Sequence, residues 1–239
     1  MTRLEIFGIE GLPEINARDD LGGMIADACA AGVPTMMLAD RDVVVVTQKI
    51  VSKAEDMLVA IDPTDPFSHK PLVERESVRI LRRRGELIIS ETKHGFVCAN
   101  AGIDLSNVQH GYAALLPEDA DRSARRIRDR LRAKAGVELG VIISDTFGRT
   151  WRRGVTDVAI GCAGIAAVVD LRGTNDALGR EMQVTEVAIA DEIAAAAELV
   201  MGKSTGIPVA VVRGLDASWF RRSSIKDEMI RAPAEDLFR

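Results

Sequence analysis

The chain has 239 residues, of which 47 % are hydrophobic, 28 % are charged and only 4 % are aromatic. This length can bury a large core, in one large domain or two small ones. The formal net charge of -5 and the scarcity of aromatic side chains argue against a surface that binds nucleic acid or an anionic membrane. An anionic substrate must therefore be bound by local basic clusters.

The cysteines and the N-terminal segment bear on the cellular compartment. Three cysteines occur without a CxxC spacing, so neither a zinc site nor a disulfide framework is predicted. The segment MTRLEIFGIEGLPEI has no signal-peptide pattern, and no apolar run approaches the roughly 18 residues of a membrane span. We expect a cytoplasmic protein that does not cross a membrane.

The first predicted elements are a strand, a helix and a second strand. Residues 4–9 have the pattern of a short strand. Asp19 or Asp20 is expected to cap a helix that runs through LGGMIADACAAG and ends near Gly32. Residues 43–46 are four consecutive valines, which is typical of a strand buried on both faces.

The next part of the chain is predicted to be a loop, a helix and a short strand. Residues 62–71 contain three prolines, which indicate a loop. A helix is expected over residues 72–83, with the three arginines at 82–84 near its C-terminal end, where positive charge suits the helix dipole. Residues 87–89 have the pattern of a strand.

Helices and strands continue to mix in the second half. Residues 119–135 form an amphipathic pattern, with Ile127 and Leu131 four residues apart among charges, which predicts a helix. Further elements are expected as a strand at 141–143, a helix at 188–201 and a strand at 208–212. Strict βαβ alternation is missing, so we predict an α+β fold with mixed sheets and packed helices. No linker marks a boundary, so residues 1–239 are one domain or two interleaved α+β subdomains.

Two carboxylates stand out because each follows a strand-like run. The stretch HGFVCANAGIDLSN at 94–107 contains Asp104 near its end, and VIISDTFGRTWRRG contains Asp145 directly after an apolar run. One interpretation is that each is a turn or cap residue. The other is that the pair holds a hard cation, with the hydroxyl of Thr146 as a further ligand and open positions for water and phosphate.

Three polar clusters are candidates for binding phosphate. In TQKIVSK, Lys53 can meet a phosphate while Gln48 or Ser52 donates hydrogen bonds, or the segment is a solvated face. The loop MGKSTG at 201–206 lacks the spacing of a Walker A motif, although its glycines and hydroxyls can still wrap phosphate. Three arginines, Arg149, Arg152 and Arg153, either bind an anion beside the metal or form a basic turn at the surface.

No nucleophile with a catalytic base is recognisable. His69 lies in the proline-rich loop, while His94 and His110 lack a serine or cysteine partner at a known spacing. Cys98 has no catalytic signature around it and is predicted to be a packing residue. Covalent catalysis is therefore disfavoured, and metal-assisted phosphoryl chemistry is favoured.

Several segments recur together in one known family. They are LPEI at 12–15, VVVVTQKIVSKAE at 43–55, HGFVCANAGIDLSNV at 94–108, LLPEDAD at 115–121, VIISDTFGRTWRRGVTDVAIG at 141–161, VTEVAIADEIAAAAELVMGKSTGIPVAVVRGL at 184–215 and the closing EDLF. In this order they resemble the coenzyme F420-0:L-glutamate ligase family, the F420 gamma-glutamyl ligases, over essentially the whole chain. The chain is similar to the stand-alone form, without the flavin-binding domain that is fused to some bacterial relatives.

The resemblance implies a reaction and its cofactors. It implies GTP-dependent addition of L-glutamate to coenzyme F420-0, with a further γ-linked glutamate as a second step that the family allows. The reaction would pass through an acyl phosphate and release GDP and phosphate. Two divalent ions, Mg²⁺ or Mn²⁺, would serve as cofactors with K⁺. A homodimer of an α+β fold is implied as well.

The resemblance also implies roles for individual residues. Asp104 and Asp145 would hold the first metal, Thr146 would help hold the second, and Lys53 and Arg149 would stabilise charge during the reaction. The nucleotide would be bound by Leu12, Pro13, Glu14, Ile15, Gln48, Lys53, Asn107, Met201, Gly202, Lys203, Ser204, Thr205, Gly206, Ile207 and Pro208.

The sequence departs from the family pattern in two places. Some relatives have an acidic residue at the position of Lys203, so here the second metal loses a ligand or the lysine meets phosphate instead. Asp56 stands where many relatives have glycine, which affects a turn but not the chemistry.

Two other classes of function stay open at this stage. One is a metal-dependent phosphohydrolase, which would need no amino-acid acceptor. The other is a non-catalytic deazaflavin- or nucleotide-binding protein, which would bind its ligand without consuming GTP.

Overall fold

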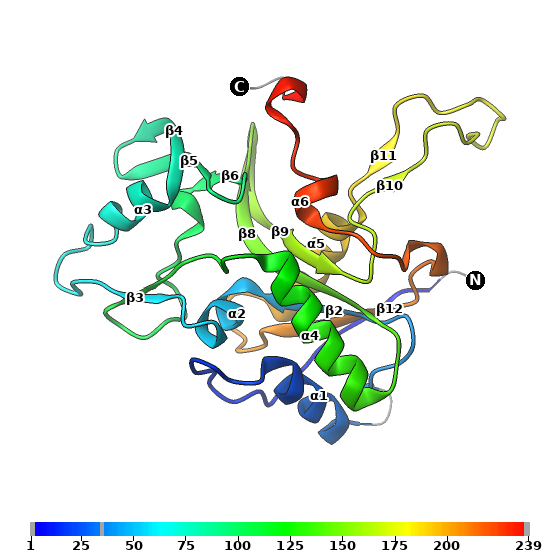
Figure 1. Cartoon of the computed structure of the whole chain (residues 1–239), viewed down its shortest axis with the longest axis horizontal. Coiled ribbons are helices and arrows are strands. Elements are labelled where there is room, and N and C mark those ends of the chain that lie inside the picture. Colours follow the sequence, from blue (N-terminus) through cyan, green and yellow to red (C-terminus); the bar gives the residue numbers. More distant parts are fainter. Residues whose placement is uncertain (1–2, 34–35, 237–239) are drawn as a thin grey trace.

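A computed structural model describes residues 3–33 and 36–236, and its largest unit is a five-stranded mixed sheet (Figure 1). The strand order is β1-β12-β2-β8-β9, with β2 and β8 parallel and the other neighbours antiparallel. The five strands are β1 (Glu5–Gly8), β2 (Val43–Thr47), β8 (Gly140–Arg149), β9 (Arg152–Ala163) and β12 (Val209–Arg213). The predicted α+β class is confirmed.

Helices cover both faces of this sheet. α1 (Leu21–Ala31) and α4 (Ala120–Ala135) pack on one face, and α5 (Ile189–Met201) packs on the other. The four valines of β2 are 0 % exposed, and alternate valines belong to the two opposite cores because side chains alternate along a strand. The prediction of a strand buried on both faces is confirmed.

The helix ends follow from capping residues in the sequence. The side chain of Asp20 accepts a hydrogen bond from the backbone N–H of Gly23 at the start of α1, and Asp119 accepts from Arg122 at the start of α4. α4 ends at Gly136, which has a φ of 70° and closes the helix in the left-handed conformation. The predictions for α1, α4 and α5 are confirmed within a residue or two.

A smaller unit is inserted between β2 and β8. It contains β3 (Leu58–Ala60) paired with β7 (Tyr112–Ala114), and a three-stranded sheet of β4 (Ser77–Arg84), β5 (Leu87–Thr92) and β6 (Val97–Ala99). α3 (Lys70–Glu76) and the 3₁₀ turn η2 (Asn100–Gly102) pack with them. This unit has its own apolar core, made by Val73, Ile88, Ala101, Ile103, Ala113 and Leu115.

The helix predicted over residues 72–83 is wrong. α3 ends at Glu76, and the following residues form β4, which pairs with β5 in an antiparallel hairpin. Gly85, with a φ of 55°, makes the tight turn between the two strands. Pairing with β5 thus overrides the helical propensity of the arginines, which lie on an exposed strand and not at a helix end.

The end of the predicted strand at 141–143 also differs. β8 continues from Gly140 to Arg149, because β9 pairs with it beyond the apolar run, with Asp145 opposite Val158 and Thr146 opposite Asp157. Asp145 therefore lies inside a strand. A strand holds a side chain in a narrower range of directions than a loop does, which suits a site that needs fixed ligands.

The remaining elements lie around this framework. α2 (Gln48–Ala54) follows β2, and β10 (Val169–Asp170) pairs with β11 (Glu186–Val187) at the base of an arm that projects from the sheet (Figure 1). The C-terminal part contains η3 (Ala217–Trp219), α6 (Ile225–Glu228) and η4 (Pro233–Glu235). Leu237 and Phe238 of the EDLF motif lie outside the described residues. In the described ranges, every helix falls short of the length and apolar character that crossing a membrane requires.

Candidate functional site

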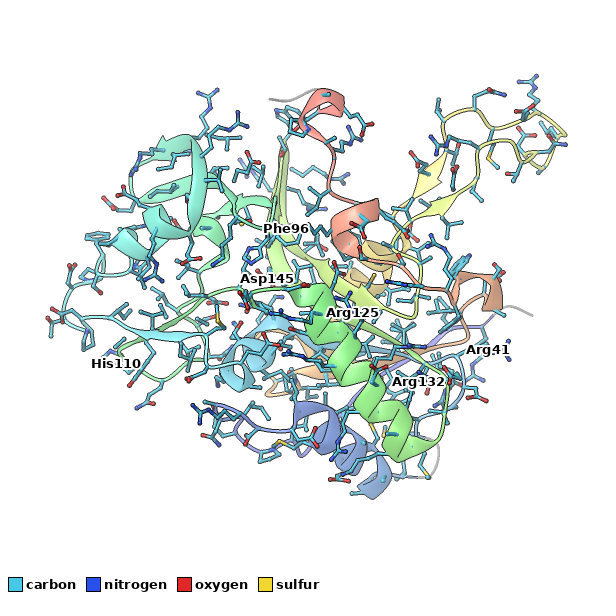
Figure 2. All side chains as sticks on the ribbon, in the orientation of Figure 1. Arg41, Phe96, His110, Arg125, Arg132 and Asp145 are labelled. Atoms are coloured by element: carbon cyan, nitrogen blue, oxygen red, sulfur yellow. The ribbon has the colours of Figure 1, made fainter. Side chains whose placement is uncertain are left out.

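A cavity of about 820 Å³ lies at one edge of the five-stranded sheet. Its wall contains every residue to which the family resemblance assigns a role except Arg149, and the other candidates Ser52, Arg152 and Arg153 lie outside it. Asp145 lies near the middle of the molecule, where β8 passes the smaller unit (Figure 2). The main sheet and the smaller unit both contribute to the wall, since Asp104 and Asn107 come from the latter.

The sheet topology explains why segments far apart in sequence meet here. β2 and β8 are parallel, so the carboxyl end of β2 lies beside the middle of β8, with Thr47 opposite Ser144. β12 is antiparallel to β2, so its start lies at the same edge, and the backbone N–H of Thr47 donates to the carbonyl of Pro208. β1 is antiparallel to β12, so the LPEI segment that follows it arrives there too.

Asp104 already has a cation beside it. The ammonium group of Lys49 lies 2.6 Å from Asp104 Oδ2, and it also donates to the hydroxyl of Ser106 at 2.9 Å. Burial by itself would raise the pKa of Asp104. Hydrogen bonds from Lys49 and from the backbone N–H of Ser106 outweigh that effect and hold the pKa below its usual value. Asp104 is therefore ionised at neutral pH.

Asp145 is in the opposite electrostatic situation. Burial raises its pKa to about 7, and the nearby charges of Asp104 and Asp157 add to the increase, although the backbone N–H of Thr146 donates a stabilising hydrogen bond of 2.8 Å. Within residues 3–33 and 36–236, no lysine or arginine forms an ion pair with Asp145. A cation between Asp145 and Asp104 would remove both the repulsion and the uncompensated charge.

The donor set at this point suits a hard divalent ion. Asp104 and Asp145 both line the cavity, and no group of three or more His, Cys, Asp or Glu residues arranged for a metal occurs among the described residues. Mg²⁺ is commonly held by one or two carboxylates, with substrate phosphates and water as its other ligands. Asp104 and Asp145 match that pattern.

A further acidic group in the cavity wall, Asp157, was missed by sequence reasoning. Its side chain is 3 % exposed and accepts hydrogen bonds from the hydroxyls of Ser144 (3.0 Å) and Thr146 (2.7 Å) and from the ammonium group of Lys203 (2.7 Å). The only signal in the sequence is an aspartate in the otherwise apolar alternation VTDVAIG. Its importance follows from the register that places it opposite Thr146.

The predicted phosphate-binding residues are held in place by their neighbours. Lys53 is buried and forms an ion pair with Glu14 of the LPEI segment. Gln48 is 1 % exposed, and its amide contacts the hydroxyl of Ser52, which also contacts the carbonyl of Leu115. Only one atom of the Gln48 amide, the oxygen or the nitrogen, faces this hydroxyl. In either orientation of the amide the other atom therefore has no protein partner.

The other predicted residues fall into two groups. Asn107 lines the cavity and donates from Nδ2 to the carbonyl of Lys203 at 3.3 Å, which connects the smaller unit to the loop after α5. Arg149 lies at the exposed tip of the β8–β9 hairpin, where it donates to the carbonyl of Arg153. It is outside the cavity wall, so its catalytic role stays a prediction.

The histidines and cysteines lie outside the cavity wall. The ring of His94 is stacked near that of Phe96, with 6.3 Å between ring centroids. All three cysteines are buried and unpaired, and burial raises the pKa of the Cys98 thiol to about 12. A thiol with that pKa is un-ionised at neutral pH, which matches a packing residue.

Comparisons with known proteins fit this arrangement. The model of the F420-0:Gamma-glutamyl ligase family matches residues 10–214, a range that includes every segment of the cavity wall. The chain belongs to this family. The resemblance predicted from the sequence motifs is confirmed.

Curated relatives agree over the full length. The coenzyme F420:L-glutamate ligases of Methanothermobacter thermautotrophicus and Methanopyrus kandleri are each 40 % identical to the chain, covering 99 % and 100 % of it and the same shares of themselves. The ligase of the same name from Methanococcus maripaludis strain C7 is 36 % identical and covers 100 % of the chain, with 98 % of its own length matched. Membership of this family makes the chain an enzyme, an amino-acid ligase.

Proposed function

We propose that this enzyme adds L-glutamate to coenzyme F420-0 in a reaction driven by GTP, and that it can extend the product with further γ-linked glutamates. The observation that carries the proposal is the convergence of five separate segments, within residues 12–15, 47–53, 104–107, 144–157 and 201–208, on one cavity in a chain of this ligase family. The same cavity offers carboxylates for a metal, a lysine for phosphate and a glycine-rich loop.

The nucleotide is proposed to lie along the loop that follows α5. Gly202 has a φ of 59° and Gly206 a φ of 75°, backbone conformations that favour glycine and shape the loop that lines the cavity. An added Cβ at Gly206 would meet nothing within 4 Å, so the loop is open there. The unpartnered end of the Gln48 amide supports a polar ligand on the opposite wall, because buried polar groups usually have a partner.

The first metal position is proposed at Asp104 and Asp145, as Mg²⁺ or Mn²⁺. A divalent ion there would neutralise the charge that develops on the phosphates during transfer. Its presence would also displace Lys49 from Asp104 or share that carboxylate with it, since Lys49 is 2.6 Å from Oδ2.

The chemistry proposed needs no protein nucleophile. The carboxylate of F420-0 attacks the γ-phosphorus of GTP, the bond to the bridging oxygen breaks, and GDP leaves. The amine of glutamate then attacks the carbonyl carbon of the acyl phosphate, and phosphate leaves while the amine loses a proton. Lys53 acts by binding and orienting phosphate, as a positive charge at the wall of the cavity.

A cytoplasmic homodimer is part of the proposal. Two projecting hairpins have strongly exposed apolar side chains, with Leu178 86 % and Val184 85 % exposed on the β10–β11 arm and Trp151 81 % exposed at the tip of β8–β9. Exposed apolar groups of this size on projecting segments support an interface between copies. Activation by K⁺ rests on the family resemblance alone.

The deciding experiment is mass spectrometry of F420-0 incubated with the purified protein, GTP, L-glutamate and Mn²⁺. A glutamyl mass increment that requires both GTP and metal is expected. Hydrolysis of GTP without glutamylation would instead favour the phosphohydrolase alternative, which family membership does not favour. Binding of GTP without turnover would contradict both catalytic proposals.

A further inference from the structure

Lys203 lies in the wall of the cavity, in the turn after α5, and its ammonium group is surrounded by oxygen atoms. Nζ is 2.7 Å from Thr146 Oγ1, 2.7 Å from Asp157 Oδ1 and 3.2 Å from Glu198 Oε1. An ammonium group has three N–H donors, so these three neighbours can use all of them. The C-terminal end of α5 favours a cation at this place as well, because the helix dipole is negative there.

The same contacts occupy the groups that a second metal ion would need. The hydroxyl of Thr146 donates to Asp157 Oδ1 at 2.7 Å, so its oxygen accepts from Lys203. The other oxygen of Asp157 accepts from Ser144 at 3.0 Å. A divalent ion on Thr146 would have to displace Lys203 or stand beside an ammonium group of like charge. The residues at Thr146 therefore do not fit a second divalent ion while Lys203 keeps this position.

We propose that the ammonium group of Lys203 replaces a second divalent ion at Thr146, so that the cavity binds one such ion, at Asp104 and Asp145. The nucleotide phosphates then lie between that ion and a positive charge that belongs to the chain. The inference rests on the proposed function, because it requires nucleotide and metal in this cavity. It goes further by stating how many ions the reaction uses and which residue takes the place of the other.

The contrast between the two sides of the cavity supports this assignment. Asp145 has no ion-pair partner in the described part of the chain, whereas the carboxylate of Asp157 has one lysine and two hydroxyls around it. The position at Asp145 therefore lacks a cation, whereas the position at Asp157 has the ammonium group of Lys203, which is part of the chain. A covalently attached cation cannot dissociate, so its occupancy does not depend on the metal concentration.

The experiment counts the Mn²⁺ ions bound to the full-length protein in the presence of a GTP analogue with an imide bridge between the β- and γ-phosphates. Free Mn²⁺ is followed by electron paramagnetic resonance. We expect one ion per chain in the wild type and two in Lys203→Glu, because the new carboxylate supplies a ligand and removes the like charge. Magnetic coupling between two adjacent Mn²⁺ ions should appear only in Lys203→Glu.

Two control variants separate charge from ligand. Lys203→Met removes the charge without adding an oxygen, so it should keep one ion while its affinity for the analogue falls about five-fold, the effect of losing a nearby unit charge worth about 1 kcal/mol. Lys226→Met changes an exposed lysine on α6, outside the cavity wall, and should leave both quantities at their wild-type values. Circular dichroism establishes that each variant is folded.

The outcomes distinguish this inference from the proposed function. Two ions in the wild type, or a single ion in a folded Lys203→Glu protein, would overturn the role of Lys203 while nucleotide binding still supported the ligase. If the wild type bound neither the analogue nor Mn²⁺, the proposed function would fail and the inference with it. Should Lys203→Glu not fold, the count in the wild type decides: two ions there overturn the inference.

Discussion

Asp145 and Asp157 lie on neighbouring strands of one sheet and line the same cavity, yet their surroundings differ completely. Asp157 is held by Ser144, Thr146 and Lys203, so its charge is balanced by the protein. Asp145 receives one backbone hydrogen bond and lies near two other carboxylates, and the charge of Lys49 only partly offsets their effect on its pKa, so its charge is incompletely balanced. The difference teaches that one side of a cavity wall can have its charge balanced by protein groups, here at Asp157, while the other requires a bound cation, here at Asp145. The predictions below change one side at a time.

The largest effect is expected from removing the carboxylate charge of Asp145 or Asp104. Asp145→Asn and Asp104→Asn should each lower kcat about 10³-fold or more, because a metal ion stabilises transition-state charge by several kcal/mol. Glutamylation of F420-0 is the measurement, with circular dichroism to establish folding. The matched control is Asp129→Asn, an exposed carboxylate on α4 outside the cavity wall. Wild-type turnover by a folded Asp104→Asn protein would contradict the metal assignment.

The next effect is a pH dependence of stability in the metal-free protein. The carboxyl of Asp145 has a pKa of about 7 when folded, against 3.8 when unfolded. Between these values the unfolded chain binds fewer protons, so the contribution of Asp145 to the free energy of unfolding falls as pH rises and is lost fully above about pH 7. The fall amounts to at most about 4 kcal/mol at 1.36 kcal/mol per pKa unit.

Urea unfolding at several pH values measures this effect. The wild type and Asp129→Asn should both show the fall, and Asp145→Asn should lack it because an amide does not titrate in this range. Parallel curves for wild type and Asp145→Asn would show that the charge of Asp145 is compensated in the folded protein, which would remove the contrast with Asp157.

A smaller effect is expected from removing Lys203, the lysine that pairs with Asp157. Lys203→Met leaves the buried carboxylate of Asp157 with two hydroxyl donors only, so the free energy of unfolding should fall by about 1–3 kcal/mol. The value lies below that for a fully buried pair because the side chain of Lys203 is half exposed. Lys226→Met should change stability by less than about 0.5 kcal/mol, as surface substitutions do. Equal effects of the two variants would show that Lys203 does not hold Asp157.

The smallest expected signal is the release of a fraction of a proton when Mn²⁺ binds. A carboxyl with a pKa of about 7 is partly protonated at pH 6.5, and a metal binds only the ionised form. Titration calorimetry in two buffers of different ionisation enthalpy gives the number of protons released. It should approach zero at pH 8.5 in the wild type, and at every pH in any residual binding by Asp145→Asn. Release that did not depend on pH would contradict the raised pKa.

Part of the fold was predictable because it depends on local patterns. Four consecutive valines indicate a strand buried on both faces, and capping aspartates before periodic apolar runs mark where α1 and α4 begin. The arginine-rich segment at 77–84 was mispredicted because its conformation depends on pairing with β5, which no pattern within the segment shows. The strand length beyond Asp145 was missed for the same reason, since β9 extends β8.

By itself, the sequence determined the family, the α+β class and most of the residues that line the cavity wall, because these follow from motifs and from residue types at fixed spacings. Only the tertiary structure decided how the charges in that wall are partnered. Asp157, Thr146 and Lys203 meet through a strand register and a turn after α5, and Asp145 stays without an ion pair among the described residues because Lys49 pairs with Asp104. Electrostatic balance depends on distances of a few ångströms between residues remote in sequence, and those distances exist only in the folded chain.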